Sequence, residues 1–182
     1  MLRPLPPSTF RDLDTVAIAR SLLGKVLVRE DGDESSPWLV TEVEAYDSER
    51  DLACHASKGR TARTDVLYRA GGIWYVYLCY GIHEMLNLVT GPAGHPAAVL
   101  IRGVAGINGP GRVTKRLQIG RELNGHPAAP GSGLFVADAG FKVPARRIVA
   151  TPRIGVDYAG PVWARKRWRF YFEPGAADWP AG

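Results

Sequence analysis

GGIWYVYLCYGIHEMLNL, residues 71–88, is the stretch of sequence that decides the fold. Its density of aromatic and β-branched residues is typical of β-strands, and Gly81 interrupts it so that Tyr80 falls at a tip. Shorter strand patterns recur along the chain at 25–29, 38–46, 97–104, 132–137, 148–151 and 168–172. Short strands separated by turn-forming segments predict a mostly antiparallel sheet.

One amphipathic helix is predicted before the first of these strands. Apolar residues recur at helical spacing over 10–23, with Ser8 and Thr9 as candidate caps and Gly24 as a stop. A second, short helix is predicted at 113–123. Turn or loop composition is found at 30–37, 47–65 and 106–111. The sequence therefore predicts a mixed domain in which the first helix packs on the sheet.

The 182 residues have an ordinary globular composition, with 46% hydrophobic and 23% charged residues. This length predicts one domain, residues 1–182, of which 173–182 read as a frayed tail. No apolar run reaches the roughly 18–20 residues of a membrane span, and Met1–Pro7 lacks the apolar core of a signal peptide. We therefore expect a cytoplasmic protein without a targeting segment.

The sequence offers little for metal or disulfide chemistry. The two cysteines, Cys54 and Cys79, are too few for a disulfide framework or a four-cysteine zinc site. The four histidines do not follow metal-ligand spacing, and the Walker, GxSxG, HExxH and CxxC motifs are absent. We expect an enzyme or a binding domain with no metal and no cofactor.

Charge is distributed unevenly, although the total is only +5. Residues 30–51 hold nine of the 18 acidic residues against one arginine, which leaves −8 there and +13 in the remainder. Residues 141–172 carry eight basic side chains and a single acidic one, Asp157. A body this basic suits a polyanion such as nucleic acid, and a merely solvated basic face is the alternative.

Glu42 and Glu44 form a candidate carboxylate pair. In a strand they share one face, with Cα atoms ~6.5–7 Å apart at ~3.3 Å per residue. Carboxylate pairs at such separations cleave glycosidic bonds, and two solvent-facing glutamates are the alternative. Glu44 lies among apolar neighbours at a strand end that enters a long loop, where active-site residues collect.

A cluster of aromatic residues is the second candidate feature. Trp74 is expected in the core, whereas Tyr75 and Tyr77 share one face of a strand. Tyrosines on a strand usually pack against neighbouring strands, but they can also stack on a flipped nucleic-acid base. Tyr80, at the tip before Gly81, could be a wedge that enters a duplex.

Six motifs occur in an order that is specific as a set. They are TEVEAY (41–46), His55, YVYLCYGIHEMLN (75–87), LIR (100–102), GPGR (109–112) and WARK (163–166). The set resembles the alkyladenine (3-methylpurine) DNA glycosylase family over residues 19–172. The resemblance implies a single α+β domain with a curved, mostly antiparallel sheet and flanking helices. It also implies base-excision repair, in which the N-glycosidic bond of alkylated or deaminated purines in double-stranded DNA is hydrolysed.

The resemblance further implies roles for individual residues. Glu44 aligns with the general base and Tyr80 with the wedge that fills the gap in the duplex. Four residues align with the base pocket of the family, namely Tyr46, His55, Tyr77 and Asn87. The resemblance implies that Asn87 rejects the exocyclic amine of guanine. Arg102 aligns with a residue that contacts the phosphate of the flipped nucleotide. Other DNA-facing or pocket-supporting positions are Arg112, Arg165 and Lys166.

These residue types suit the implied reaction. A base must leave the duplex before a side chain can reach it, and a cationic alkylpurine stacks well on tyrosine faces. Glu44 can then stabilise an oxocarbenium-like state and deprotonate a water. No lysine in the motifs is placed to form an imine, so a monofunctional enzyme that leaves an abasic site is expected.

Two rival functions stay open at this point, a non-catalytic nucleic-acid-binding module and a carbohydrate hydrolase using Glu42 and Glu44. The lesion range is also open, and a monomer is the default. The implied activity places the expected protein in the cytoplasm, associated with the nucleoid. Ile82, His83 and Glu84 depart from the family pattern beside the wedge, and Glu84 would bring negative charge close to the DNA.

Overall fold

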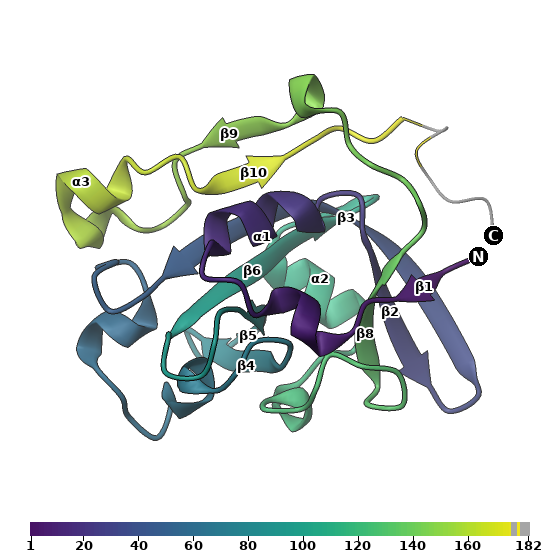
Figure 1. Ribbon diagram of the computed structural model, residues 1–182, viewed down its shortest axis with the longest axis horizontal. Coiled ribbons are helices and arrows are strands. Elements are labelled where there is room, and N and C mark those ends of the chain that lie inside the picture. Colours follow the sequence, from purple (N-terminus) through teal and green to yellow (C-terminus); the bar gives the residue numbers. More distant parts are fainter. Residues whose placement is uncertain (176–177, 179–182) are drawn as a thin grey trace.

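The computed structural model describes residues 1–175 and 178, and antiparallel strands dominate it (Figure 1). Within these residues the strands are β1 (Arg3–Pro4), β2 (Val26–Asp31), β3 (Glu34–Asp47), β4 (Trp74–Cys79), β5 (His83–Val89), β6 (Ala97–Val104), β7 (Ile107–Asn108), β8 (Leu134–Asp138), β9 (Val149–Thr151) and β10 (Arg169–Tyr171). The α-helices of the same residues are α1 (Thr15–Leu22), α2 (Pro110–Arg116) and α3 (Gly160–Ala164), and short 3₁₀ helices lie in several of the loops. The predicted α+β class is therefore confirmed.

Strand β3 connects the two halves of the sheet. The main path runs β1-β8-β2-β3-β6-β5-β4, and every pairing along it is antiparallel. The first half of β3 pairs with β2, as in Leu27 opposite Trp38, while its second half lies between β6 and β10. Figure 1 shows β9 and β10 above α1 with α3 at one end of them, and β10 joins them to the sheet through β3.

A β-bulge interrupts the pairing of β3 with β6 next to Glu42. Glu42 faces Gly103, but the next residue, Val43, faces Ile101, so Arg102 has no direct partner. Bulges redirect side chains and are common beside active sites. Here the bulge turns Arg102 toward the two glutamates of β3, because its Nε donates a hydrogen bond to Glu42 and forms an ion pair with Glu44.

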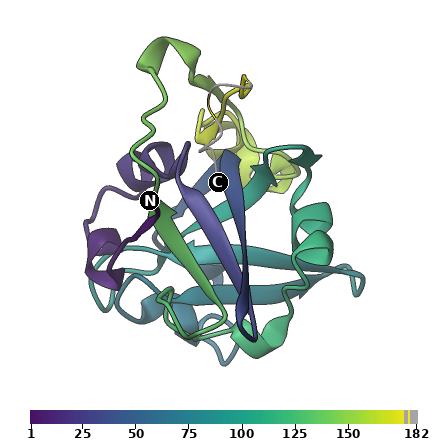
Figure 2. The ribbon, with the colours of Figure 1, turned by 90° about the vertical axis from the view of Figure 1, so that its right-hand side faces the viewer.

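The hydrophobic core lies between α1 and the sheet, and the stretch that decides the fold supplies its largest side chain. Trp74 has no exposed surface, and its indole N–H donates a 2.8 Å hydrogen bond to the carbonyl of Leu134. Ile18 and Leu22 of α1 pack in the same cluster. Figure 2 shows the twisted strands from the side, with α1 beside them. The core prediction for Trp74 is confirmed.

Several element boundaries differ from those predicted. Helix α1 begins at Thr15 rather than Phe10, because Asp14 caps it by accepting a 2.8 Å hydrogen bond from the backbone N–H of Ala17. The predicted turn at 30–37 shrinks to the two residues between β2 and β3, with Gly32 at φ 59°. Strand β7 replaces part of the predicted turn at 106–111, and α2 starts at Pro110, three residues before the prediction.

Part of the predicted frayed tail, 176–177 and 179–182, lies outside the described residues. In the described part of the tail, Arg147 donates hydrogen bonds to the carbonyl of Glu173 and to the carboxylate of Asp178. No helix among the described residues is long and apolar enough to cross a membrane.

Candidate active site

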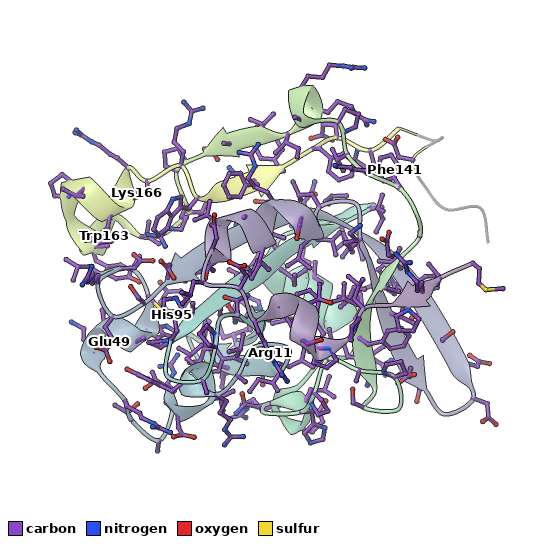
Figure 3. The ribbon with its side chains drawn as sticks, viewed as in Figure 1. Arg11, Glu49, His95, Phe141, Trp163 and Lys166 are labelled. Atoms are coloured by element: carbon purple, nitrogen blue, oxygen red, sulfur yellow. The ribbon has the colours of Figure 1, made fainter. Side chains whose placement is uncertain are left out.

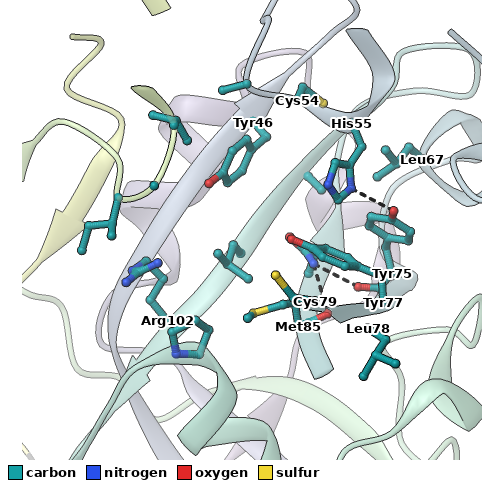
Figure 4. A pocket seen from close by; sticks show the side chains of 18 of the residues that line it. Tyr46, Cys54, His55, Leu67, Tyr75, Tyr77, Leu78, Cys79, Met85 and Arg102 are labelled. Carbon is teal, nitrogen blue, oxygen red and sulfur yellow. Dashed lines mark hydrogen bonds between the residues drawn. The ribbon is translucent and has the colours of Figure 1, made fainter. Parts of the chain in front are cut away.

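A cavity of about 480 Å³ opens between the β4–β5 hairpin, β6 and the loops that follow β3 and β9. Six of the ten predicted site residues line it, namely Tyr46, His55, Tyr77, Tyr80, Asn87 and Arg102. Figure 4 shows Tyr46 and Arg102 on one side, with His55 and Tyr77 across from them. The volume lies within the range of small-molecule pockets.

Glu44 lies directly behind this cavity. Its side chain has no exposed surface. One carboxylate oxygen accepts a 2.8 Å hydrogen bond from the Tyr46 hydroxyl, and the other accepts a 2.8 Å hydrogen bond from the backbone N–H of Ile154. Tyr46, Ile154 and Arg102 all line the cavity, so they separate Glu44 from it.

The surroundings of Glu44 favour a raised proton affinity. Burial raises the pKa of the Glu44 carboxyl above its ordinary value, and the negative charge of Glu42 adds to this. The positive charge of Arg102, 3.5 Å away, lowers the pKa, as do the hydrogen bonds from Ile154 and Tyr46. Burial is the largest of these causes, so Glu44 takes up a proton more readily than an exposed glutamate. A general base near neutral pH needs such tuning.

Glu42 has a different environment from Glu44, although both side chains reach Arg102. Its carboxylate accepts hydrogen bonds of 2.9 Å from Arg102 Nε and 2.6 Å from Arg169 Nε. The solvent-facing alternative is wrong, because Glu42 is 8% exposed and Glu44 is 0% exposed. Because both glutamates contact Arg102, the prediction that they share one face of the strand is confirmed.

The resemblance predicts that Arg102 contacts a phosphate. In the structure its Nε contacts the carboxylates of Glu42 and Glu44. The side chain keeps 12% of its surface exposed and lines the cavity. A phosphate contact by Arg102 stays a prediction.

Aromatic rings form the wall opposite Tyr46. The rings of Tyr75 and Tyr77 lie 5.2 Å apart, which confirms their predicted common face. The His55 ring meets Tyr77 edge-on at 4.6 Å, and its Nδ1 lies 3.0 Å from the Tyr75 hydroxyl. Burial, together with the positive charge of Arg63, lowers the pKa of His55 to about 4. The imidazole is therefore neutral at pH 7.

Asn87 is held rigidly at the floor of the cavity. It is 4% exposed, and its amide nitrogen donates 3.2 Å hydrogen bonds to the carbonyls of Tyr75 and Met85. Because the backbone of two strands fixes the amide, Asn87 can act as a steric and polar filter for a ligand.

The tip of the β4–β5 hairpin projects from the rim of the cavity. Tyr80 is 93% exposed and Ile82 is 74% exposed. Tyr80 adopts φ 50°, a left-handed conformation that a non-glycine residue rarely takes. The carboxylate of Glu84, predicted to bring negative charge here, lies 3.1 Å from Arg121 Nε, which offsets that charge.

The remaining predicted cations do not line the cavity. Arg112 is exposed on α2, and Arg165 and Lys166 are exposed just after α3. Figure 3 shows Lys166 and Trp163 at the α3 end of the molecule. The Lys166 ammonium lies 5.4 Å from the ring centre of Trp168 and 5.6 Å from that of Trp163.

Sequence reasoning missed four contributors to the site. Two of them surround Glu44, namely the backbone N–H of Ile154 and the buried ion pair between Arg153 and Asp51. The other two are the side chains of Arg63 and Tyr158, which line the cavity. Arg153 was visible only as one member of a basic stretch, and Asp51 only as one of an acidic stretch. A backbone N–H has no sequence signal, since every residue except proline carries one.

Comparison with known proteins connects this site to a repair family. The family model of methylpurine-DNA glycosylases matches residues 9–108 and 104–175. A protein of Methanocella arvoryzae is 43% identical over 92% of both chains. A protein of Anaeromyxobacter sp. strain Fw109-5 is 44% identical over 90% of this chain and 86% of its own. A protein of Myxococcus xanthus is 40% identical over 91% of this chain and 88% of its own. All three carry the provisional name 3-methyladenine DNA glycosylase.

Proposed function

The chain belongs to the methylpurine-DNA glycosylase family, and from this membership we propose that it excises damaged purines from double-stranded DNA. The observation that carries this function is Glu44, a fully buried carboxylate with a raised pKa directly behind an aromatic cavity. A purine flipped into the cavity would stack between Tyr46 and the pair formed by Tyr77 and His55. Asn87 would meet an edge of the base.

The chemical step is a hydrolysis. Glu44 takes a proton from a water, whose oxygen forms a bond to C1′ of the sugar while the bond from C1′ to the purine breaks. The electron pair of that bond stays with the purine. A purine alkylated at N3 or N7 is cationic and leaves as a neutral base, whereas a neutral lesion such as hypoxanthine must take up a proton from a solvent water as it leaves.

Glu44 has no exposed surface in the free chain, so water must be admitted to it. Each oxygen of the carboxylate already accepts one hydrogen bond, from the Tyr46 hydroxyl or from the Ile154 N–H, so the water would approach Glu44 as a further partner from the side of the cavity.

The two rival functions fit the site less well. A carbohydrate hydrolase would need Glu42 as the second carboxylate, but two arginines bind it. A pure nucleic-acid binder gains nothing from a buried carboxylate behind its stacking surface, because a carboxylate repels phosphate.

Single-turnover excision on duplexes that contain one hypoxanthine or one ethenoadenine tests the function. Strand breaks that appear only after alkali would support a monofunctional glycosylase. A protein–DNA adduct trapped by borohydride would contradict the monofunctional mechanism. Absence of breaks on these two substrates and on methylated DNA would contradict excision itself.

Replacement of Tyr80 by alanine is expected to weaken binding to a lesion-containing duplex about tenfold. An inserted aromatic ring is worth about 1–3 kcal/mol when it stacks on bases, and Tyr80 is 93% exposed, so the variant should fold normally. Fluorescence anisotropy measures the affinity. Tyr171→Ala, a tyrosine in β10 outside the cavity lining, serves as the control. Equal affinities of Tyr80→Ala and the wild type would remove Tyr80 from the wedge role.

DNA affinity is expected to fall steeply with salt. Three exposed cations, Arg112, Arg165 and Lys166, would each neutralise one phosphate, giving a slope of about −3 in log affinity against log salt. Arg165→Ala should reduce that slope by about one unit. Anisotropy titrations between low and physiological salt measure both values. An unchanged slope in Arg165→Ala would place this side chain away from the DNA backbone.

A further inference from the structure

Arg153 and Asp51 form a completely buried ion pair beside the active site, with no exposed side-chain surface on either partner. The guanidinium donates hydrogen bonds to both carboxylate oxygens, one of them 2.8 Å long. None of the reaction steps derived above uses either residue.

Stability alone does not account for this pair. Removing two charges from water costs several kcal/mol per ion, and a buried pair is often no more stabilising than apolar side chains of similar volume. In addition, Arg153 Nε is buried without a hydrogen-bond partner among the described residues. A buried polar group left unsatisfied calls for a functional reason.

Both hydrogen-bond donors to Glu44 lie next to Arg153. Ile154, whose backbone N–H binds Glu44 at 2.8 Å, is the next residue in the chain. The guanidinium also lies 4.7 Å from the ring centre of Tyr46, whose hydroxyl binds the other oxygen of Glu44. A shift of Arg153 would therefore displace both donors at once.

The pair also joins the chain segments that surround the cavity. Asp51 accepts hydrogen bonds from the backbone N–H groups of Asp47 and Ala53, in the loop that leads to His55. Arg153 donates to the carbonyls of Ala45 at 2.9 Å and Trp163 at 3.3 Å. The end of β3, the loop after β9 and the segment around α3 thus meet at one guanidinium.

A stacked column continues from this guanidinium toward the predicted DNA-facing surface. Arg153 lies 5.2 Å from the ring centre of Trp168, and the ammonium of Lys166 lies 5.4 Å from that same ring. Contacts made by Lys166 with DNA would therefore act on the same ring that supports Arg153.

We propose that Arg153 and Asp51 are a positioning pair, which holds the two hydrogen-bond donors of Glu44 and the two walls of the base cavity in one fixed arrangement. This role presupposes the excision activity proposed above. Arg153 touches neither the base nor the reacting atoms, so it acts through Ile154 and Tyr46. Misplacement by about 1 Å at a distance from the chemistry can cost about 10²-fold in rate.

Arg153→Lys and Asp51→Asn test the positioning role. Lysine keeps the charge but cannot bind Asp51, Ala45 and Trp163 at once, and asparagine keeps the shape of Asp51 but not its charge. We expect the single-turnover excision rate at saturating enzyme to fall about 10–100-fold, with lesion affinity changed less than about threefold. The matched controls, Arg3→Lys and Asp138→Asn, alter an Arg–Asp pair between β1 and β8 and should excise at the wild-type rate.

The pH profile separates positioning from a general structural role. The hydrogen bonds from Ile154 and Tyr46 lower the pKa of Glu44, as does Arg102, while Glu42 and burial raise it. Arg153 also acts on Glu44 through its positive charge, which Arg153→Lys keeps. Loosening the two donors in Arg153→Lys should therefore raise the pKa of Glu44 and move the acidic limb of the rate profile to higher pH. A ¹³C-NMR titration of Glu44, assigned with Glu44→Gln, should show the same shift without requiring activity.

Three results would overturn the positioning role. One is a wild-type rate in both variants, and another is a rate loss with no change in the pH profile or the NMR titration of Glu44. The third is a rate loss that matches the unfolded fraction measured by circular dichroism. If Arg153→Lys does not fold, Asp51→Asn is held to the same criteria. Failure of wild-type excision would count against the glycosylase function, whereas the NMR titration tests the positioning of Glu44 independently.

Discussion

Replacing Glu44 with glutamine is expected to reduce the excision rate about 10²–10⁴-fold while leaving the affinity for a lesion-containing duplex intact, because general-base catalysis contributes a factor of this size. Glutamine has nearly the same shape and can still accept the 2.8 Å hydrogen bond from the Ile154 N–H. It cannot accept a proton from water. The cavity lining, the tip of the hairpin and the exposed cations are unchanged, so binding should persist.

Single-turnover kinetics and anisotropy on the same duplex measure the two effects. Glu34→Gln is the matched control, because Glu34 lies at the exposed start of the same strand, β3. Measurable excision by Glu44→Gln close to the wild-type rate would remove Glu44 from the role of base. Joint loss of excision and binding would instead indicate that the substitution disrupts the cavity.

The same variant should be more stable than the wild type at neutral pH. Because burial raises the pKa of Glu44 in the folded state, the folded state binds this proton more tightly than the unfolded state does. Stability from this group is fully present below the unfolded pKa and is lost as pH rises through the folded pKa. Glutamine does not ionise, so its gain in melting temperature should be largest near pH 7 and disappear near pH 4. Thermal unfolding of the variant and the wild type in buffers across this pH range measures the difference in melting temperature.

Trp74→Ala is expected to lower the free energy of unfolding by about 3–5 kcal/mol, the usual cost of truncating a buried aromatic ring. Trp74 has no exposed surface, and its indole N–H binds the carbonyl of Leu134 at 2.8 Å. The substitution leaves a cavity between β4 and β8 and removes the indole hydrogen bond to this carbonyl, which keeps a 3.2 Å hydrogen bond from the Ser132 hydroxyl. Since domains are typically stable by only about 5–15 kcal/mol, most of the folded state's margin would be lost.

Urea unfolding followed by circular dichroism measures this loss. Trp38→Ala is the control, because Trp38 is half-buried and its indole N–H binds only Ser36, two residues away on the same strand. It should cost less than half as much as Trp74→Ala. Equal losses in the two variants would show that Trp74 is not a special anchor of the sheet.

Local patterns in the sequence predicted the parts of the site that lie on single strands. The two-residue spacing of Glu42 and Glu44 placed both on one face, and both reach Arg102. The same spacing placed Tyr75 beside Tyr77. These inferences succeed because alternation in a strand depends only on neighbouring residues. The fold class follows from the same strand patterns.

Tertiary structure alone decided how the two glutamates differ and what supports them. Glu42 accepts hydrogen bonds from two arginines. Glu44 is buried behind Tyr46 and accepts a hydrogen bond from the backbone N–H of a residue 110 positions away in the chain. Arg153 and Asp51 are 102 positions apart. Burial and partner geometry determine proton affinity, and both arise only when distant segments pack together. Strand spacing therefore identifies Glu44 as a candidate, but only the packed fold gives it the environment of a base.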